Sequence, residues 1–416
     1  MSEEKSKVSK NVTTESYKGV RDFYPEEQAI QNYIFDIMRS TVTLFGYKEY
    51  NASPLEYSEL YTDKTSEEIV SEQTYTFMDR GGRNVTLRPE MTPTVARMIA
   101  SRRKAMAFPQ RLFSIPNVFR YERPQRGRLR EHYQLNADLF GIDGIDAEIE
   151  IIDLANELLK RFGLKEDQYE IYINDRSILE DKFEELELDP KKKQAVYRLL
   201  DKKDKIDDFD EKLNELIGGD LLVGLEANER IDQLIEELSA RGINNVKFKP
   251  YLVRGFDYYT GVIFEIFDTN PDNSRSLFGG GRYDDLLEVF GEEPVSAVGF
   301  GMGDVTIRDV LETYDLLPKE ISFTDIYVCV SDRQYKVYAD NVATRLRKNG
   351  IRTVVDMRYD TIDSQLKRSK KYGSKFALVV DEEAFNSDKL ILKDEYGKTL
   401  GQKSLEEVVA IYKREV

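Results

Sequence analysis

The run RLFSIPNVFRYERPQRGRLREHYQLNADLF, residues 111–140, gives the clearest indication of the fold. Its two ends, 111–121 and 131–140, alternate apolar and polar residues, as strands with one buried face do. The segment between them, 122–130, is basic and contains a glycine, which predicts a long, positively charged hairpin loop. We therefore expect an antiparallel hairpin within a sheet.

The second strand of this hairpin has one polar face. Because side chains alternate along a strand, this face carries four polar residues: His132, Gln134, Asn136 and Asp138. Arg120 and Glu122 share a face of the first strand. Such a face is ordinarily just solvated. The combination of an arginine, carboxylates and an amide could also bind a zwitterion beside a phosphate. Arginine donates in a planar fork to phosphoryl oxygens, and carboxylates accept from N–H groups.

Helical and extended patterns divide the rest of the chain. Apolar spacing predicts helices over 26–45 and 93–106, and strand patterns resume at 251–267. We expect an α+β domain around a central antiparallel sheet, formed by residues 1–163 and 248–318, with a mostly helical insertion over 164–247.

Residues 322–416 follow a Pro-containing linker and alternate between strand and helix. The expected strands are 325–330, 351–356 and 375–380, and the expected helices are 333–348 and 360–372. This order predicts a small α/β domain with a parallel sheet.

The composition excludes several classes of function. No run of about 18 apolar residues exists, so we expect no membrane span. The single cysteine, Cys329, excludes an internal disulfide and a multi-cysteine metal site, and we expect a cytoplasmic protein with no dedicated metal site. With one histidine, His132, the chemistry must depend on Arg, Glu, Asp, Gln and Tyr.

The net charge of −16 argues against RNA binding, but residues 322–416 hold about three more basic than acidic residues.

Five segments together resemble histidyl-tRNA synthetases: Tyr17–Asp22, Leu87–Thr92, Phe119–Gln125 with Tyr133 and Gln134, Leu252–Tyr259, and Gly280–Asp284. In the class II synthetases, residues 46–54 resemble motif 1, the hairpin resembles motif 2, and Val298–Val310 resembles motif 3. The resemblance implies that ATP and Mg²⁺ activate histidine as an adenylate, which then passes to the 3′ end of histidine tRNA. It also implies a homodimer through the motif 1 region, and an anticodon-binding domain at 322–416.

The resemblance assigns roles to individual residues. Arg120 and Arg254 would be catalytic and bind the ATP α-phosphate, while Glu122 and His132 would contact the adenine end. Glu90, Thr92 and Gln134 would hold the α-amino group of histidine, and Asp138 with Tyr259 would read its imidazole. The predicted histidine site also includes Met91 and Tyr258.

Two groups of residues would contact tRNA. The hairpin loop would touch the acceptor end through Gln125, Arg126 and Arg128. The C-terminal domain would approach the anticodon through six residues: Arg358, Gln365, Lys367, Arg368, Lys370 and Lys371. A solvated basic helix face is the alternative interpretation of the second group.

Two positions depart from the family pattern. Thr306 stands where motif 3 usually ends with an arginine that binds the γ-phosphate, and His132 stands where a phenylalanine usually stacks on adenine. One alternative is a regulatory paralogue that binds histidine without charging tRNA. Such paralogues typically lack the C-terminal domain and the arginine of the Leu252–Tyr259 segment. Another class II synthetase is a further alternative, which the Asp138 and Tyr259 pair disfavours.

Overall fold

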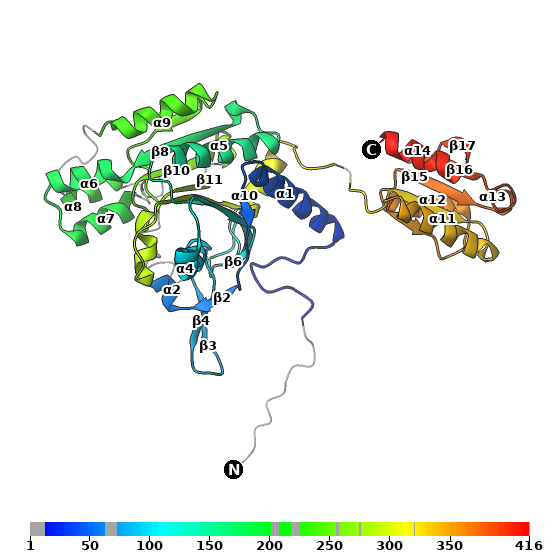
Figure 1. Ribbon diagram of the computed structural model, residues 1–416, viewed down its shortest axis with the longest axis horizontal. Coiled ribbons are helices and arrows are strands. Elements are labelled where there is room, and N and C mark those ends of the chain that lie inside the picture. Colours follow the sequence, from blue (N-terminus) through cyan, green and yellow to red (C-terminus); the bar gives the residue numbers. More distant parts are fainter. Residues whose placement is uncertain are drawn as a thin grey trace, which may run out of the picture. The chain divides into compact units, whose positions relative to one another are not determined.

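The computed structural model describes residues 13–62, 73–200, 203, 206, 208–217, 225–254, 258–273, 276–319 and 321–415. The chain divides into two compact units, Met1–Leu317 and Pro318–Val416 (Figure 1). No helix in the described part of the chain is long and apolar enough to cross a membrane.

A nine-stranded sheet forms the centre of the first unit. Its strands are β1 (Lys48–Glu49), β5 (Gln110–Ser114), β6 (Asn117–Phe119), β7 (Glu131–Phe140), β8 (Tyr169–Asp175), β9 (Val246–Phe248), β10 (Val262–Asp268), β11 (Ser276–Arg282) and β12 (Ala297–Gly303). They lie in the order β1-β5-β7-β12-β11-β10-β8-β9, and β6 pairs with β7. Only the edge pairs β1–β5 and β8–β9 are parallel. The expected antiparallel sheet and its hairpin, β5 and β6 with β7, are therefore confirmed.

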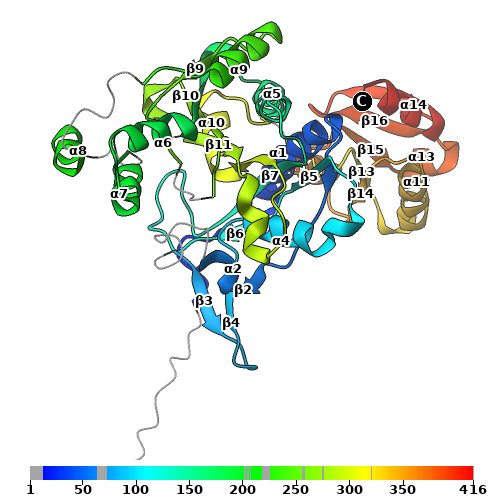
Figure 2. The same ribbon diagram turned by 60° about the vertical axis from the view of Figure 1, so that its left-hand side comes forward.

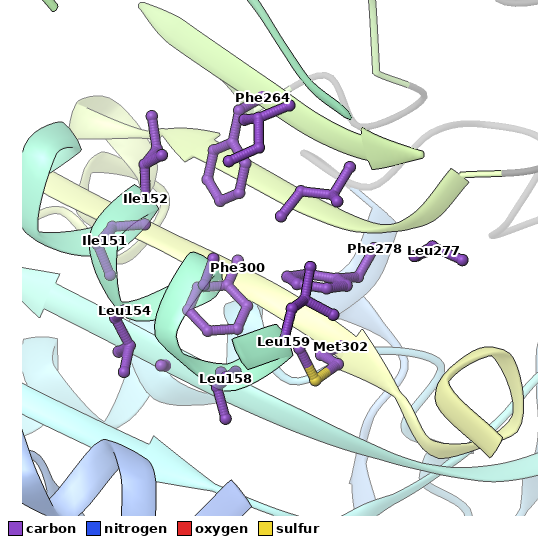
Figure 3. Close-up of a cluster of buried hydrophobic side chains, with 14 of the residues drawn as sticks. Ile151, Ile152, Leu154, Leu158, Leu159, Phe264, Leu277, Phe278, Phe300 and Met302 are labelled. Atoms are coloured by element: carbon purple, nitrogen blue, oxygen red, sulfur yellow. The ribbon is translucent and has the colours of Figure 1, made fainter. Parts of the chain in front are cut away.

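Helices cover the apolar face of this sheet. They are α1 (Pro25–Leu44), α5 (Asp146–Arg161), α9 (Glu229–Ala240) and α10 (Asp304–Thr313). Leu135, Ala137 and Leu139 of β7 are buried beneath them. Figure 3 shows side chains of α5, such as Ile151 and Leu158, beside side chains of the sheet. The apolar half of the predicted alternation along β7 therefore packs in the main core.

The opposite face carries α4 (Thr92–Arg102), η1 (Arg103–Ala105) and η5 (Asp284–Phe290), with a second, smaller core. Figures 1 and 2 both show α5 and α9 on one side of the sheet and α4 on the other. The polar half of β7, residues 134, 136 and 138, points to this second face.

A three-stranded sheet lies on the α4 side. It contains β2 (Leu55–Tyr57), β4 (Asn84–Leu87) and β3 (Tyr75–Met78) in that order, and α2 (Glu59–Thr62) follows β2. On one face, Leu55 and Tyr75 flank Leu87, while Tyr57 and Phe77 flank Val85. Because Leu55, Tyr57 and Phe77 are about half exposed, this apolar sheet face is open to solvent.

The segment expected to be mostly helical needs a correction at both ends. Its helical elements are η2 (Glu166–Gln168), α6 (Arg176–Glu185), α7 (Pro190–Leu200), α8 (Phe209–Ile217) and α9, but β8 and β9 belong to the central sheet. The apolar side chains of Tyr169, Ile171 and Ile173 alternate along β8 and are fully buried. The strand expected from residue 251 begins only at Val262 and is followed by η4 (Pro271–Asn273) and then β11.

The second unit has a five-stranded mixed sheet. The strands β13 (Ile326–Val330), β14 (Thr353–Val355), β15 (Phe376–Val380), β16 (Leu390–Asp394) and β17 (Thr399–Lys403) lie in the order β14-β13-β15-β16-β17. The first three are parallel, as predicted, while β16 and β17 extend the sheet as an antiparallel hairpin that was not predicted. The helical elements are η6 (Arg333–Tyr335), α11 (Lys336–Lys348), α12 (Ile362–Lys371), α13 (Glu382–Ser387) and α14 (Leu405–Glu415).

Candidate active site

A cavity of about 140 Å³ lies on the polar face of the central sheet. It brings together seven of the predicted site residues: Glu90, Thr92, Arg120, Gln134, Arg254, Tyr258 and Tyr259. It adds six that were given no role: Asn136, Gly279, Tyr283, Gly299, Phe300 and Gly301. Gly255, Phe256 and Asp257 of the predicted segment lie outside the described residues. The alternation along residues 131–140 already places Asn136 on the polar face with Gln134, but the resemblance gives Asn136 no role.

Three glycines make room for the polar side chains of the cavity. A Cβ at Gly301 would lie 2.3 Å from the Gln134 amide nitrogen, and one at Gly299 would lie 2.2 Å from the Asp138 carboxylate. A Cβ at Gly279 would lie 2.3 Å from the Arg254 guanidinium. Since Gly299 pairs with Asp138, and Gly301 with Asn136, the glycines of β12 leave the space that the polar chains of β7 fill.

Two arginines approach the cavity from different elements. Arg120 follows β6, and its Nε donates to the Pro89 carbonyl at 2.9 Å. Arg254 precedes β10, and its Nη1 donates to Glu265 Oε1 at 2.9 Å. Burial alone lowers the pKa of Arg254, while Tyr259 and Glu265 beside it raise that pKa above its usual value, so the guanidinium stays charged. The two cations can therefore bind an anionic ligand between them.

Acceptors for a cationic ligand lie on the α4 side. Glu90 is 2% exposed, and Tyr258 donates its hydroxyl to Glu90 Oε2 at 2.9 Å. Thr92 begins α4 and also lines the cavity. Met91 is fully buried and is not among the residues that line the cavity, where its predicted place in the histidine site would have put it.

The amide of Gln134 is held by its neighbour on the same strand face. Its Nε2 donates to Asn136 Oδ1 at 2.6 Å, and Asn136 Nδ2 donates back to the Gln134 carbonyl at 3.2 Å. Because this bond engages the amide nitrogen of Gln134, the amide oxygen is the atom that can accept a hydrogen bond from a ligand.

Asp138 lies behind the cavity wall rather than in it. It is 2% exposed, and Tyr283 donates its hydroxyl to Asp138 Oδ1 at 2.5 Å. Burial raises the pKa of Asp138 to about 7, although the Tyr283 hydrogen bond acts in the opposite direction. Tyr283 was quoted in the Gly280–Asp284 segment without a role, and it is the residue through which Asp138 reaches the cavity.

A buried ion pair supports this wall. Arg282 is 3% exposed, and it donates to Glu148 through Nε at 2.7 Å and through Nη2 at 2.6 Å. Its backbone carbonyl accepts from the Thr260 N–H at 2.8 Å. Because Tyr259 and Tyr283 are the chain neighbours of Thr260 and Arg282, this ion pair fixes both tyrosines.

His132 is uncharged at neutral pH. Burial lowers its pKa to about 3, and the charges of Arg120 and Arg21 lower it further. A neutral imidazole ring can stack on a base without adding a third positive charge beside the two arginines. Glu122 lies outside the cavity residues and pairs with Arg128 at 3.4 Å.

Thr306, which stands where motif 3 of the family usually has an arginine, lies in the first turn of α10 and makes other contacts. Thr306 donates its hydroxyl to the Leu277 carbonyl at 2.8 Å, and Arg308 pairs with Glu312 at 2.9 Å. The hairpin loop lies over this turn, since Arg126 is 3.8 Å from Asp309 and a Cβ at Gly127 would be 3.8 Å from Thr306. A cation of the loop therefore lies next to position 306.

Within the described residues, no group of three or more His, Cys, Asp or Glu side chains could hold a metal ion. The carboxylates nearest the two arginines are already engaged, Glu90 by Tyr258 and Glu265 by Arg254. A Mg²⁺ ion at this site would accordingly be held mainly by the phosphates of a nucleotide, which is its usual mode of binding.

The predicted RNA surface of the second unit needs a correction. Gln365 is fully buried and bonds the backbone of Val330 through both its amide oxygen and its nitrogen, so it does not face RNA. Arg368 is held by Asp356 at 2.7 Å and by Asp360 at 2.5 Å. Arg358, Lys367, Lys370 and Lys371 are exposed.

Comparisons with known proteins agree over nearly the whole chain. The family model described as Histidyl-tRNA synthetase matches residues 19–220 and 209–305, and the one described as Anticodon binding domain matches residues 325–415. A protein named Histidine--tRNA ligase from Leptospira biflexa is 40% identical over 408 residues, which cover 92% of this chain and 93% of that protein. A protein of the same name from Thermoplasma volcanium is 37% identical over 412 residues, covering 91% and 94%. The fold is similar to that of an apo histidyl-tRNA synthetase from S. aureus, with a TM-score of 0.74 at 24% identity, covering 96% of this chain and 100% of that one.

Proposed function

The chain belongs to the histidyl-tRNA synthetase family, and we propose that it activates histidine with ATP and transfers it to the 3′ end of histidine tRNA. The observation that carries the proposal is the convergence of Arg120 and Arg254 on a cavity that also contains Glu90 and Gln134. Cations for a phosphate and acceptors for an ammonium group are the two halves of an amino-acid activation site.

In the first step, an oxygen of the histidine carboxylate attacks the α-phosphorus of ATP, and the bond to the β-phosphate oxygen breaks. Pyrophosphate leaves, and histidyl-adenylate remains. Arg120 and Arg254 bind the α-phosphate from its two sides and offset the charge that develops there. Because the substrate itself supplies the nucleophile, the protein contributes mainly position and charge.

Histidine is held at both ends. Glu90, Thr92 and Gln134 accept hydrogen bonds from its α-ammonium group, Gln134 through its amide oxygen, because its amide nitrogen is engaged by Asn136. At the other end, Tyr259 and the Asp138–Tyr283 pair bind the imidazole. Tyr258 holds the Glu90 carboxylate in place through its hydroxyl.

ATP enters with Mg²⁺ bound to its phosphates. The neutral His132 ring stacks on the adenine, and Glu122 contacts the adenine end. Arg126 of the hairpin loop supplies a cation next to Thr306, where an arginine is missing.

In the second step, the terminal ribose hydroxyl of the tRNA attacks the histidyl carbonyl, and AMP leaves. Gln125, Arg126 and Arg128 contact the acceptor end, and the exposed Lys367, Lys370 and Lys371 lie near the anticodon arm. Arg368 supports that surface through Asp356 and Asp360 rather than by binding RNA directly.

The working form is a homodimer in the cytoplasm, where tRNA and ATP are available. Residues 46–54 lead directly into β2, whose apolar residues Leu55 and Tyr57 lie on the open face of the three-stranded sheet. An exposed apolar sheet face of this kind is typical of a surface that another chain covers.

The regulatory paralogue is not favoured. Arg254 lines the cavity, and the anticodon-binding family model matches 325–415. Both features serve tRNA charging rather than histidine sensing alone.

Histidine-dependent exchange of radioactive pyrophosphate into ATP tests the proposal, followed by charging of histidine tRNA. Exchange with histidine and with no other standard amino acid is the expected result. Exchange that is absent with histidine but strong with another amino acid would refute it. Exchange with histidine but no charging of tRNA would indicate the paralogue instead.

A further inference from the structure

The segment that precedes α1 lies directly on the hairpin loop, residues 122–130. The carbonyl of Gly19 accepts from the N–H of Arg130 at 2.8 Å and from that of Glu131 at 3.2 Å, where the loop enters β7. A Cβ at Gly19 would lie 2.8 Å from the Arg130 side chain and 2.9 Å from Pro124. The segment therefore packs against both ends of the loop.

Residues 17–20 form a tight turn, which we call the 17–20 turn. The Val20 N–H donates to the Tyr17 carbonyl at 3.1 Å, and Gly19 has a φ of +85°. Glycine adopts a positive φ without the strain that a side chain would cause, so it suits this position. The turn brings the Gly19 carbonyl and the Tyr17 ring to the hairpin together.

Arg130 connects the 17–20 turn to the residues proposed to bind ATP. Its Nη1 donates to the Tyr17 hydroxyl at 2.9 Å, and its guanidinium lies 5.5 Å from the centre of the Tyr17 ring and 4.0 Å from that of Tyr121. Its Nε donates to the Glu122 carbonyl at 3.1 Å, and its own carbonyl accepts from the Arg120 N–H at 2.9 Å. The Arg130 side chain thus contacts Tyr121 and Glu122, while its backbone fixes Arg120.

We propose that the 17–20 turn is a positioning element for ATP, which acts through Arg130 to hold Arg120 and Glu122 in their binding geometry. This inference rests on the proposed function, since it assumes that Arg120 binds the α-phosphate and that Glu122 contacts the adenine end. The Glu122 N–H donates to the Arg120 carbonyl at 2.7 Å, so these two residues form one compact unit of the chain. A contact that holds one of them therefore also holds the other.

The histidine end of the site has supports of its own. Tyr258 donates to Glu90, and Gln134 donates to Asn136. The apparent affinity for a ligand falls in proportion to the fraction of the protein that is in the binding-competent conformation. Because the contacts of the 17–20 turn raise that fraction for the hairpin loop, their loss should weaken the binding of ATP and leave the binding of histidine unchanged.

The KM for ATP in histidine-dependent pyrophosphate exchange, measured for the full-length variants Tyr17→Ala and Tyr17→Phe, tests this inference. Tyr17→Ala removes one hydrogen bond and one cation–π contact, which should raise the KM for ATP about tenfold. Tyr17→Phe keeps the ring and should raise it about threefold. The kcat at saturating ATP should stay within about twofold, because bound ATP itself selects the ordered loop. Histidine affinity, measured by calorimetry without ATP, and Tm should not change.

A pair of glycine variants separates the contact with the hairpin from backbone strain. Gly19→Ala and Gly242→Ala both place an alanine at a positive φ, +85° and +78°. The Cβ at position 19 meets Arg130 and Pro124, whereas the Cβ at position 242 meets nothing within 4 Å in the described part of the chain. Only Gly19→Ala should raise the KM for ATP. Tyr24→Ala, in the same segment but with a side chain that is 70% exposed, should behave as the wild type.

In an Arg130→Ala background, Tyr17→Ala should have little further effect, because its partner is already absent. Three results would overturn the inference: an unchanged KM for ATP in Tyr17→Ala, an equal loss of histidine affinity, or a full additional effect of Tyr17→Ala in the Arg130→Ala background. Any of them, with a wild type that exchanges pyrophosphate in the presence of histidine, rejects only the role of the 17–20 turn. A wild type that exchanges pyrophosphate with no amino acid rejects the proposed function and this inference together.

Discussion

Replacing Gly301 with alanine is expected to lower kcat/KM for histidine about a hundredfold while leaving the fold intact. The new Cβ would lie 2.3 Å from Gln134 Nε2, where ordinary contact begins at 3.4 Å, so the amide must move by about 1 Å. That movement breaks the 2.6 Å hydrogen bond to Asn136 and displaces the acceptor of the substrate ammonium group. A displacement of about 1 Å at a substrate-positioning group can reduce the rate about 10²-fold.

The fold should tolerate this change because the atoms in conflict belong only to side chains. They are two atoms of Gln134 and, at 3.3 Å, Asn136 Oδ1. Gly280→Ala provides the contrast, since its Cβ would lie 1.9 Å from the Gly299 backbone carbonyl, which cannot move without separating two strands. Gly303→Ala is the matched control on the same strand, with its nearest contact an ordinary 3.6 Å to Thr306.

The assay is histidine-dependent pyrophosphate exchange, accompanied by thermal unfolding of each variant. Gly301→Ala should lose activity with a nearly unchanged Tm, Gly280→Ala should lose stability, and Gly303→Ala should behave as the wild type. If Gly301→Ala kept kcat/KM within threefold of the wild type at an unchanged Tm, the assigned role of the Gln134 amide would be wrong.

Four other predictions concern separate parts of the molecule. Arg120→Ala and Arg254→Ala should each slow adenylate formation about 10²–10³-fold in single-turnover experiments with little change in histidine affinity; rates within a few-fold of the wild type would contradict their assignment. Neutralising Lys367, Lys370 and Lys371 together should weaken tRNA binding and reduce its salt dependence, since each lost phosphate contact removes somewhat under one unit of slope; an unchanged slope would mean that this helix face is only solvated. Glu148→Gln should destabilise the protein by about 3–5 kcal/mol in urea unfolding, because Arg282 would stay buried with only Asp284, at 3.2 Å, to offset its charge; a loss below about 1 kcal/mol would show that the Arg282–Glu148 pair matters little. The folded-state pKa of Asp138, about 7, lies above its unfolded value, so this group reduces stability progressively as the pH rises from about 4 to about 7. Asp138→Asn should remove that part of the pH dependence of Tm, and an identical Tm-against-pH curve would contradict the buried, protonated state.

The sequence predicted local structure better than it predicted what each face contacts. Alternation along residues 131–140 correctly separated Leu135 and Leu139, in the main core, from Gln134 and Asp138, on the cavity side. The alternation of β8 was overlooked because Lys, Asp and Glu dominate the segment around it. The local pattern of a strand does not reveal that its neighbours will be strands of the same sheet.

The candidate site shows the same limit. The resemblance indicated Arg254, but the register that sets Gly279 opposite Glu265, and so fits the guanidinium between them, depends on pairing between distant strands. The resemblance of residues 322–416 to an anticodon-binding domain placed Gln365 near RNA. In the structure its amide replaces a backbone partner at the end of β13, at Val330, which no periodicity can indicate.

The alternation of apolar and polar residues along β7 determines which substitutions this sequence can accept during evolution. Neighbouring residues of this strand are constrained in different ways. Leu135 and Ala137 must fit the volume of a packed core, whereas Gln134 and Asn136 must fit the geometry of a ligand. A substitution of Leu135 or Ala137 changes the stability of the protein at every temperature and with every substrate. A substitution of Gln134 or Asn136 changes only the turnover of the enzyme. The glycines of β12 restrict this face further, because a side chain in place of Gly299 or Gly301 has space only if the polar side chain of β7 that it meets shortens at the same time. Substitutions of the glycines on this face of the sheet must therefore occur together with a change in the facing side chain.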